Sequence, residues 1–507
     1  MLKGKIKLSY FALLISFINL ILYHLPFYEF VCNNINLKSL SGILLLVSLT
    51  VLAIFLNAFV FYIGLFLLRA IGKWILILFF NMNAIALYFI NTYSVIIDRS
   101  MIGNVLNTNF EESSSFFSFT LILYLIFLGI IPSILLFKVR YVRPTIKKFL
   151  VHTSLTLVFL LSLAYANATN WLWIDKNSKT LGAIVMPWSY VVNTCRFYHK
   201  KYKENEKQIL LPDATIKNDE KSIAVIVIGE SARSQNFSLY GYEKNTNPLL
   251  SKIENVRHFQ AESCATYTTA GVKCILEHEN TSKLYEILPN YLYRNNVEVI
   301  WRTTNWGEPK VNIKNFLSRT ELRKQCKGTE CEYDGVLLNN LKEQILASDK
   351  NKILIVLHTS TSHGPTYYKK YPERFSTFTP ECKNVELALC TQEELINSYD
   401  NTIVYTDYLL ASLIEELKQL KEYKSSMMFV SDHGESLGEN NLYMHGLPKS
   451  IAPEEQFDIP FIVWTSENSV GIKDKKVLEQ HHVFHSVLDF LDIDSPVYDE
   501  DMSIFKE

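Results

Sequence analysis

Acidic and histidine side chains follow directly after apolar strands at two places in this chain. The run Ile223–Ile228 is unbroken, apolar and β-branched, which predicts a strand buried on both faces, and Gly229 and Glu230 come next. The run SMMFV leads in the same way toward Asp432 and His433. Ligands bind at the carboxyl ends of strands in an open α/β sheet, so we expect catalytic or ligand-binding side chains at these positions. The alternative at each place is an ordinary strand followed by a solvated turn.

Carboxylate and imidazole groups together are typical ligands of zinc. A catalytic zinc site has three protein ligands and one open or reactive position, and Glu230, Asp432 and His433 form such a set. An isolated Asp-His-Gly is common in turns. The pairing with a second acid at a second strand end favours a metal site.

Hydroxyl groups gather in the stretch ESCATYTTAGVKC, residues 262–274, ahead of a predicted helix. A hydroxyl at a helix N-terminus faces unpaired amides and the positive end of the helix dipole, which suits a phosphorylated intermediate. A metal would lower the pKa of the hydroxyl and make it a nucleophile. Without a metal, a threonine-rich capped turn is the better interpretation.

Three further histidines lie beside these elements. His358 ends the run ILIVLH, His363 lies in the loop beyond it, and His445 follows in LYMHGLP. Such histidines can bind a second metal, transfer a proton to a leaving group, or make a loop hydrogen bond. We expect a structural role for His358 and a functional role for His363 and His445.

The first third of the chain is strongly apolar. Five segments there approach or exceed the length that crosses a bilayer, and five in succession favour a membrane domain over a buried globular core. No small-residue cleavage site follows the first segment, so it reads as a retained anchor. The segments run from Leu8 to Leu25, Leu40 to Leu68, Trp74 to Ile97, Phe116 to Phe137 and Phe149 to Tyr165.

Positive charge in the loops predicts how the chain crosses the membrane. Lys and Arg concentrate before the first span, between the second and third, and between the fourth and fifth, which places these loops in the cytoplasm. With five spans, the large C-terminal part is then exported. The basic residues are Lys3, Lys5, Lys7, Arg69, Lys73, Lys138, Arg140, Arg143, Lys147 and Lys148.

Cysteine usage supports an exported C-terminal part independently. Six of the eight cysteines lie there as three close pairs, and an exported compartment permits disulfides, so we expect three local bridges. No Cys-x-x-Cys unit favours zinc binding instead. The pairs are Cys264 with Cys274, Cys326 with Cys331 and Cys382 with Cys390, while Cys32 and Cys195 have no close partner in the sequence.

These features predict three parts. Residues 1–168 form an α-helical domain of five transmembrane helices, and residues 169–220 form an interfacial connector, rich in tryptophan and tyrosine, and a polar linker. Residues 221–507 form an exported catalytic domain. Lys plus Arg (50) nearly cancels Asp plus Glu (51), so the overall charge gives no sign of a nucleic-acid partner.

The C-terminal part alternates short apolar runs with longer helical patterns. The helical patterns include Glu393–Tyr423 and Val477–Leu491. This alternation indicates an α/β domain with a mostly parallel sheet covered by helices on both faces. The predicted strands include residues 223–228, 297–301, 353–357, 426–430 and 460–464.

Taken together, the chain resembles the phosphoethanolamine transferases of the lipid A type, which are inner-membrane enzymes of the alkaline phosphatase and sulfatase superfamily. The resemblance covers essentially the whole chain and rests on GESARSQNFSLYGYEKNTNP, SCATYTTAGVKC, SHGPTYY and SDHGESLGE, with MHG beyond. It implies a multi-pass protein of the bacterial inner membrane whose sulfatase-like domain lies in the periplasm.

The resemblance also implies a ligand set. In that family the glutamate after the first strand, the nucleophilic threonine and an Asp-His pair hold a catalytic zinc, which corresponds to Glu230, Thr268, Asp432 and His433. Thr266 and Thr269 compete with Thr268 for the nucleophile. Thr268 is preferred because it lies four residues after Cys264 and six before Cys274, as the family's nucleophile does.

Further residues carry over as substrate contacts. The family's donor-site histidines match His363 and His445, with a second metal near them left open. Its phosphate-contacting loop matches TTNWGEPK, which has one extra residue and implies roles for Asn305 and Lys310. A segment that contacts the lipid head group matches MIGNVLNTNFEES and places Asn104, Thr108 and Glu112 on one helical face, with a capped loop helix as the alternative.

The function implied is a zinc-dependent transfer of phosphoethanolamine by double displacement. Thr268 attacks phosphatidylethanolamine, diacylglycerol leaves, and the phosphoethanolamine-threonine intermediate reacts with lipid A, a related glycolipid or a surface protein. This is an envelope modification of the kind linked to polymyxin resistance. We expect a membrane-bound monomer. The alternatives are a phosphoglycerol transferase or sulfatase of the same superfamily, and a non-catalytic membrane sensor, against which the intact zinc set argues.

Overall fold

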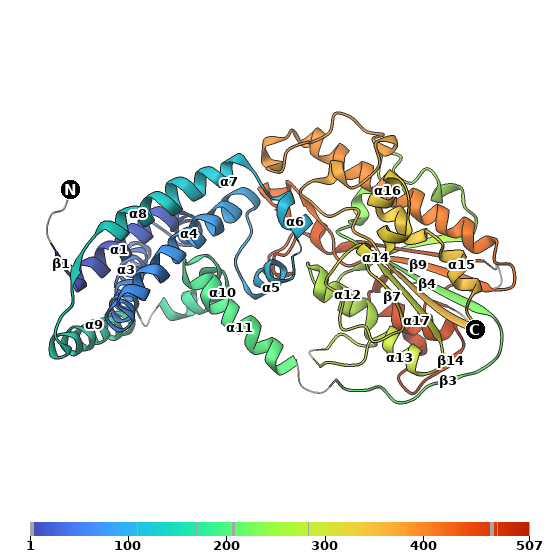
Figure 1. The fold of residues 1–507 in the computed structure, drawn as a ribbon, viewed down its shortest axis with the longest axis horizontal. Coiled ribbons are helices and arrows are strands. Elements are labelled where there is room, and N and C mark those ends of the chain that lie inside the picture. The colour runs from blue at the N-terminus through green and yellow to red at the C-terminus, as the bar shows by residue number, and fades with distance from the viewer. Residues whose placement is uncertain are drawn as a thin grey trace. The chain divides into compact units, whose positions relative to one another are not determined.

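The computed structural model describes residues 5–108, 110–167, 170–204, 208–281, 283–466, 471–473 and 475–505. The chain divides into two compact units, both visible in Figure 1. One comprises Met1–Leu106 and Phe117–Lys200, and the other comprises Asn107–Phe116 and Lys201–Glu507. The first is helical, whereas the second is built around a β-sheet.

Long apolar helices form the N-terminal unit. Within the described residues, α3 (Leu40–Leu68), α4 (Ala70–Tyr93), α9 (Ile146–Ala166) and the segment Phe119–Lys138 are long and apolar enough to cross a bilayer. Only 6% of the most apolar window of α9 is buried inside the protein, as expected for a helix that faces lipid. Phe119–Lys138 consists of α7 (Phe119–Tyr124), the π-helical segment η1 (Leu125–Ile130) and α8 (Ile131–Lys138).

The first predicted span is a bent pair of helices. α1 (Leu8–Tyr23) and α2 (Leu25–Asn34) meet at 69°. Pro26 lies in the first turn of α2, where its missing N–H and fixed φ are tolerated. In the interior of one continuous helix the same proline would cause a break or a kink. The apolar, helical character of the predicted membrane half is therefore confirmed. Its described part contains four spanning candidates, or five if the bent pair is one span.

Two helices follow the last apolar segment. They are α10 (Trp171–Ile184) and α11 (Trp188–Glu204), and they occupy the stretch predicted as an aromatic connector. Trp188 donates its indole N–H to Asn57 of α3 at 2.5 Å, and Tyr190 donates its hydroxyl to Asn83 of α4 at 2.9 Å. These contacts bind α11 to the apolar helices of its own unit.

An eight-stranded sheet forms the centre of the C-terminal unit, in the order β13-β5-β12-β9-β4-β8-β6-β7. The central strands pair in parallel, and β12 is antiparallel to both of its neighbours, so the predicted mostly parallel sheet is confirmed. The strands are β4 (Ser222–Gly229), β5 (Val256–Glu262), β6 (Glu298–Thr303), β7 (Asn315–Leu317), β8 (Lys352–His358), β9 (Lys424–Ser431), β12 (Asp458–Thr465) and β13 (Val477–Glu479).

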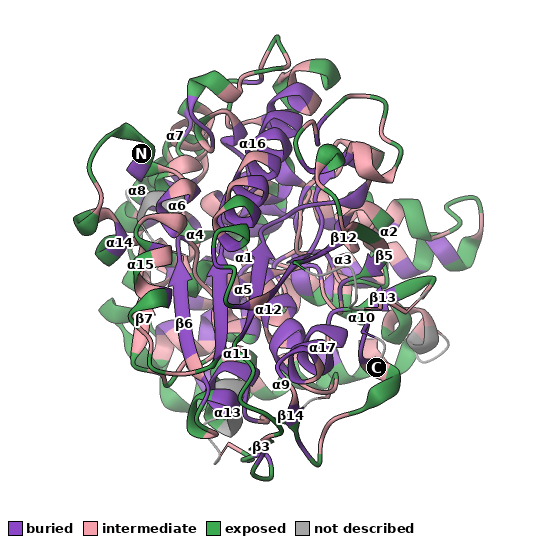
Figure 2. Cartoon of the chain, turned by 90° about the vertical axis from the view of Figure 1, so that its right-hand side faces the viewer, coloured by how far each residue is buried: buried purple, intermediate pink, exposed green. Residues whose placement is uncertain are grey.

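Helices cover both faces of this sheet. One face packs on α12 (Thr268–Leu276), α13 (Leu288–Arg294) and α17 (His482–Phe490), which share one apolar cluster with alternate residues of the strands. Figure 1 shows α16 (Gln392–Lys418) on the opposite side of the sheet, and Figure 2 shows the strands buried between the two helical layers. Every residue of β4 is buried, which matches its continuous apolar sequence.

The predicted helix Val477–Leu491 is wrong at its start. Val477–Glu479 is the edge strand β13, which pairs in parallel with β5, and α17 begins only at His482. Leu478 is fully buried in this position. Pairing with the edge of the sheet therefore overrides the helical pattern of the local sequence.

Shorter elements complete the two units. They are β1 (Ile6–Lys7) with β2 (Tyr141–Val142), β3 (Thr215–Ile216) with β14 (Ile493–Asp494), β10 (Ser436–Leu437) with β11 (Tyr443–Met444), and the helices α5 (Arg99–Asn107), α6 (Phe110–Ser115), α14 (Arg319–Gln325) and α15 (Leu341–Leu346). All three predicted disulfides are confirmed: Cys264–Cys274, Cys326–Cys331 and Cys382–Cys390. Cys32 and Cys195 are free.

Candidate metal and catalytic site

Two parallel strands bring Glu230 and Asp432 to the same edge of the sheet. β4 and β9 pair in register up to Gly229 and Ser431, so the residues after each strand are neighbours. The backbone continues this pairing, because the N–H of Asp432 donates to the carbonyl of Gly229 at 2.9 Å. The N–H of Ser231 then donates to Oδ1 of Asp432 at 3.0 Å. The two stretches singled out from the sequence therefore meet.

Histidine and carboxylate atoms converge at this edge. One ligand atom each from Glu230, His433 and His445 lie within 4.8 Å of one another. Asp432 adjoins them, with Oδ2 3.4 Å from Nε2 of His433. That Oδ2 is buried and has no hydrogen-bond partner within the described part of the chain. Two carboxylates, one of them with an unsatisfied oxygen, and two imidazoles fit the donor set of a zinc ion.

Thr268 is the hydroxyl that reaches this group. It is the first residue of α12, and its Oγ1 lies 3.5 Å from Oε2 of Glu230 and 3.4 Å from Nε2 of His433. Its competitor Thr266 donates instead to the carbonyl of Leu447. The structure therefore brings Thr268, and not Thr266, among the candidate ligands. The amides of the first turn of α12 add a positive field suited to phosphate.

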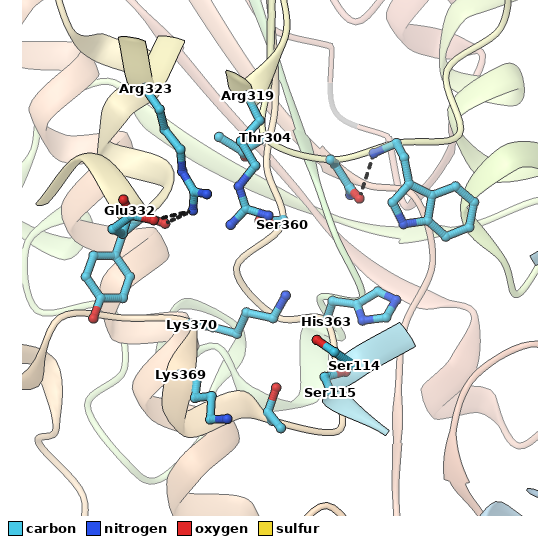
Figure 3. Close-up of a pocket in the computed structure, with 14 residues that line it drawn as sticks. Ser114, Ser115, Thr304, Arg319, Arg323, Glu332, Ser360, His363, Lys369 and Lys370 are labelled. Carbon is cyan, nitrogen blue, oxygen red and sulfur yellow. Dashed lines mark hydrogen bonds and ion pairs between the residues drawn. The ribbon is translucent and has the colours of Figure 1, made fainter. Parts of the chain in front are cut away.

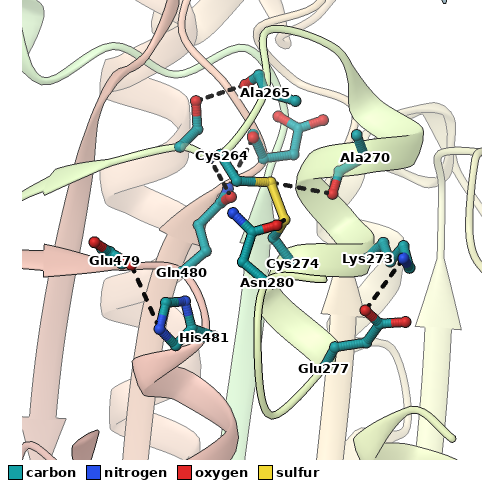
Figure 4. The surroundings of a disulfide bond; sticks show 12 residues. Cys264, Ala265, Ala270, Lys273, Cys274, Glu277, Asn280, Glu479, Gln480 and His481 are labelled. Atoms are coloured by element: carbon teal, nitrogen blue, oxygen red, sulfur yellow. Dashed lines mark hydrogen bonds and ion pairs between the residues drawn. A yellow bond between two sulfur atoms is a disulfide. The ribbon is translucent and has the colours of Figure 1, made fainter. Parts of the chain in front are cut away.

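Close packing holds α12 against the strand end. A β-carbon at Gly271 would lie 2.1 Å from the backbone oxygen of Asp432, so only glycine allows this approach. The Cys264–Cys274 disulfide closes the chain around the helix start (Figure 4). Gln480 links the segment before α12 to the residues after β9. Its side-chain amide accepts from the N–H of Cys264 at 3.0 Å and donates to the carbonyl of Asp432 at 2.8 Å.

Burial and mutual charge shift the pKa values of the clustered groups. Burial raises the pKa of Asp432 well above its usual value, and the neighbouring Glu230 carboxylate raises it further. Burial lowers the pKa of His433 to about 3, so its imidazole is neutral and can act as a ligand. Burial opposes the ionisation of Glu230, but its electrostatic interaction with neighbouring histidines, His363 foremost, and the hydrogen bond from Ser231 outweigh burial and lower the pKa of Glu230. A cation here would stabilise both carboxylates in their ionised form.

Glu435 orients His445 and was missed in the sequence. It is fully buried, and its Oε2 lies 2.6 Å from Nδ1 of His445, while its Oε1 accepts from the hydroxyl of Tyr367 at 2.5 Å. A carboxylate that holds a histidine in this way fixes its ring orientation and tautomer. The signal available in the sequence was its position three residues after Asp432 in SDHGE.

Comparison with known proteins shows the family. A sulfatase family model matches residues 222–493, and a model described as phosphoethanolamine transferase EptA/EptB matches residues 52–202. The phosphoethanolamine transferase EptA of Helicobacter pylori is 39% identical over 511 residues, which covers 98% of this chain and 96% of that protein. The chain belongs to the phosphoethanolamine transferases of the sulfatase superfamily.

Two further relatives agree with this membership. The phosphatidylethanolamine transferase Mcr-1 of Escherichia coli is 32% identical and covers 79% of this chain and 80% of that protein. A solved structure, the integral membrane protein lipooligosaccharide phosphoethanolamine transferase A (EptA) from Neisseria meningitidis, is 27% identical, with a TM-score of 0.87 over 99% of both chains. The chain studied is thus a multi-pass membrane protein with a soluble C-terminal domain.

Of the two loop residues carried over from the family, Asn305 reaches the site of the transferase and Lys310 does not. Asn305 donates its side-chain amide to Oε2 of Glu230 at 2.6 Å and to the carbonyl of Thr359 at 2.7 Å. Lys310 is exposed, and its backbone carbonyl accepts a hydrogen bond from Asn290.

A cavity of about 330 Å³ adjoins the site of this phosphoethanolamine transferase. Asn305 and His363 border it, so it is continuous with the residues around Glu230. Figure 3 shows the side chains of Arg319, Arg323 and Lys370 directed into the same space, with Arg323 paired to Glu332 at 2.8 Å. The remaining lining residues are Ser114, Ser115, Thr304, Trp306, Tyr333, Ser360, Thr366 and Lys369.

The predicted single helical face of Asn104, Thr108 and Glu112 is wrong. Asn104 lies in α5, which ends at Asn107, and Thr108 lies outside both helices. Glu112 belongs to α6, but its side chain lies outside the described residues. Asn and Thr side chains compete for backbone hydrogen bonds, so a run such as Asn107–Thr108 favours a helix end over a helix interior.

Proposed function

We propose that this transferase moves phosphoethanolamine from phosphatidylethanolamine to lipid A or a related envelope acceptor, with Thr268 as the nucleophile. The names of its relatives support the donor and the acceptor class, since they include a phosphatidylethanolamine transferase and a lipooligosaccharide phosphoethanolamine transferase. The observation that carries the proposal is the position of the Thr268 hydroxyl, 3.5 Å from Glu230 and 3.4 Å from His433.

Glu230, Thr268, Asp432 and His433 would hold one zinc ion, and His445 is close enough to contribute a further ligand. Zinc bound there would lower the pKa of the Thr268 hydroxyl and offset the negative charge that develops on the phosphoryl oxygens. A second metal beside His363 and His445 is part of the same proposal, because their rings lie 5.4 Å apart.

The reaction proceeds in two displacements. In the first, a bond forms between Oγ1 of Thr268 and phosphorus, and the bond from phosphorus to the diacylglycerol oxygen breaks. His363 or His445 supplies the proton to that oxygen. In the second, an oxygen of the acceptor forms a bond to phosphorus, the bond from phosphorus to Oγ1 of Thr268 breaks, and the proton of an acceptor hydroxyl passes to the histidine that gave one up in the first step. The first-turn amides of α12 favour the negatively charged phosphodiester in both steps.

The proposal also includes the cellular compartment in which the catalytic unit works. Disulfides persist in oxidising compartments, and all three lie in the C-terminal unit, which supports a periplasmic catalytic unit on an inner-membrane anchor. The distribution of Lys and Arg in the loops supports the same orientation. An anchor confines the enzyme to the surface where both lipids lie and raises their effective concentration.

Intact mass of the protein after exposure to phosphatidylethanolamine tests the proposal. We expect a phosphoethanolamine adduct on the wild type that maps to Thr268, and none on Thr268→Ala. Phosphatidylglycerol serves as the control donor and should leave no adduct. An adduct that forms equally on Thr268→Ala, or only from phosphatidylglycerol, would contradict the assignment.

A further inference from the structure

The segment 304–310, here called the Asn305 loop, lies directly on the nucleophile. Asn305 donates to Oε2 of Glu230 at 2.6 Å, the same oxygen that Oγ1 of Thr268 approaches at 3.5 Å. Gly307 has φ +91°, and a β-carbon there would lie 3.3 Å from the γ2 methyl groups of Thr268 and Thr269. A small movement of this loop would therefore change the surroundings of both Glu230 and the attacking hydroxyl.

A buried contact between Glu308 and His358 fastens the loop to the sheet. Oε1 of Glu308 lies 3.2 Å from Nδ1 of His358, the last residue of β8, and the two side chains are only 15% and 0% exposed. The hydroxyl of Thr303 lies 3.5 Å from the same Nδ1, and the ring of Trp301 packs edge-on at 6.4 Å. Within the described residues, Nε2 of His358 makes no hydrogen bond. The polar contacts of the ring therefore lie on the side of Glu308.

The energetics of burial make this pair sensitive to the loss of one partner. Burial opposes the ionisation of Glu308, but its contact with His358 and its hydrogen bond with Thr303 outweigh burial and lower the pKa of Glu308. Removal of one member leaves the other polar group buried without its hydrogen-bond partner, which is costly. The loop would then rearrange to expose the remaining group.

The attachment points of the loop are arranged around the nucleophile. Asn305 is fixed to the carbonyl of Thr359, and Glu308 is fixed to the preceding residue, His358. Gly307, between these two anchors, is the residue that covers Thr268. The end of β8 thus determines where both Asn305 and Gly307 lie.

We propose that Glu308 and His358 are positioning residues whose buried contact holds the Asn305 loop in place, so that Asn305 stays on Glu230 and Gly307 stays on Thr268. Neither residue touches the reacting atoms in this proposal. The catalytic part of the test rests on the proposed function, whereas the position of the loop is tested independently of activity.

The chain offers a matched control on the same strand. Lys352 begins β8, and its Nζ lies 3.2 Å from Oδ2 of Asp492, with the lysine 1% exposed. This pair has the same separation and comparable burial, but it lies at the opposite end of the strand. Lys352→Met should therefore destabilise the protein without moving the Asn305 loop.

The experiment compares Glu308→Leu, Glu308→Gln and Lys352→Met in the detergent-solubilised full chain. For Glu308→Leu we expect kcat to fall about 10- to 100-fold, because displacements near 1 Å have effects of this size, with KM for the donor unchanged. Glu308→Gln keeps an acceptor for the His358 N–H and should recover most of kcat. Lys352→Met should lower Tm and leave kcat of the folded enzyme unchanged.

Hydrogen–deuterium exchange gives the readout that does not depend on activity. Residues 304–310 should exchange faster in Glu308→Leu than in the wild type, slightly faster in Glu308→Gln, and at the wild-type rate in Lys352→Met. Unchanged exchange in both Glu308 variants would overturn the proposal, as would an equal loss of kcat in Lys352→Met. If Glu308→Leu does not fold, the exchange of Glu308→Gln decides. A wild type without a Thr268 adduct would refute the proposed function and leave the exchange test intact.

Discussion

The side-chain amide of Asn305 donates a hydrogen bond to Glu230, with 2.6 Å between Nδ2 and Oε2. Glu230 follows β4 and Asn305 follows β6, and β8 lies between these two strands in the sheet. The contact therefore spans the width of three strands at their carboxyl ends. It connects the candidate metal site to the loop that borders the adjoining cavity.

Replacing Asn305 should damage the reaction far more than replacing Lys310. Asn305→Leu removes the donor to Glu230, and we expect kcat to fall about 10- to 100-fold because preorganised contacts at the reacting centre are lost. Lys310 is exposed and uses its backbone carbonyl, so Lys310→Met should change kcat and KM less than about threefold. Steady-state kinetics on both variants measure this. Equal losses would show that Lys310 reaches the substrate.

Alanine at Gly271 should disrupt the approach of α12 to the strand end. Its β-carbon would lie 2.1 Å from the oxygen of Asp432, so the helix or the ligand strand must shift. We expect a loss of about 2–3 kcal/mol in the free energy of unfolding and at least a 100-fold fall in kcat. Gly182→Ala is the control, since among the described residues no heavy atom outside the local helix backbone lies within 4 Å of the added carbon. Thermal unfolding and initial rates measure both effects. Wild-type stability and kcat in Gly271→Ala would contradict the prediction.

The stability of the catalytic unit should depend on pH through Glu277. Burial raises the pKa of this carboxyl to about 7 from an ordinary value of 4.5, although Lys273 acts in the opposite direction. The folded protein therefore keeps a proton that the unfolded chain releases, and stability falls as pH rises from 4.5 through 7. At pH 8, Glu277→Gln should be more stable than the wild type, on the order of 1–3 kcal/mol.

Denaturant unfolding at pH 5 and pH 8 checks this expectation. The advantage of Glu277→Gln should appear at pH 8 and be small at pH 5. Glu279→Gln is the control for removing a nearby charge, because the side chain of Glu279 is 46% exposed. A constant difference between wild type and Glu277→Gln at both pH values would show that the carboxyl does not titrate in this window.

The disulfides should separate into one that supports the reaction and one that supports only stability. Cys264–Cys274 closes a segment of sequence separation 10 around Thr268, and Cys382–Cys390 closes one of separation 8 elsewhere. Serine at both cysteines of either pair should cost about 2–3 kcal/mol. Only the first pair of substitutions should also slow formation of the Thr268 adduct, measured by intact mass over time. Equal slowing by both would point to a general loss of folding.

Much of the site could be predicted because its residues follow recognisable strands. A strand buried on both faces must be apolar throughout, so β4 and β9 stand out in the sequence, and the polar residues after them stand out equally. Parallel pairing then brings Glu230 and Asp432 together. The close cysteine pairs were readable for a similar reason, since short separations in an exported part favour local bridges.

The chemistry of the local sequence does not decide between Thr266 and Thr268, because both residues carry a hydroxyl and both lie near the start of the same helix. Tertiary structure separates them, since Thr266 donates to the carbonyl of Leu447 while Thr268 faces Glu230 and His433. The helical face expected for Asn104 and Thr108 failed because periodicity alone does not show where a helix ends.

By itself, the sequence determined the apolar half, the central strands, the local disulfides and the acidic and histidine residues at the strand ends. Those features depend on composition, short spacings or continuous burial, which are properties of neighbouring residues. Only the tertiary structure decided that Glu435 holds His445 and that Glu308 holds His358. These carboxylates look like ordinary loop acids in the sequence, and they gain their partners only where distant segments fold together and exclude water.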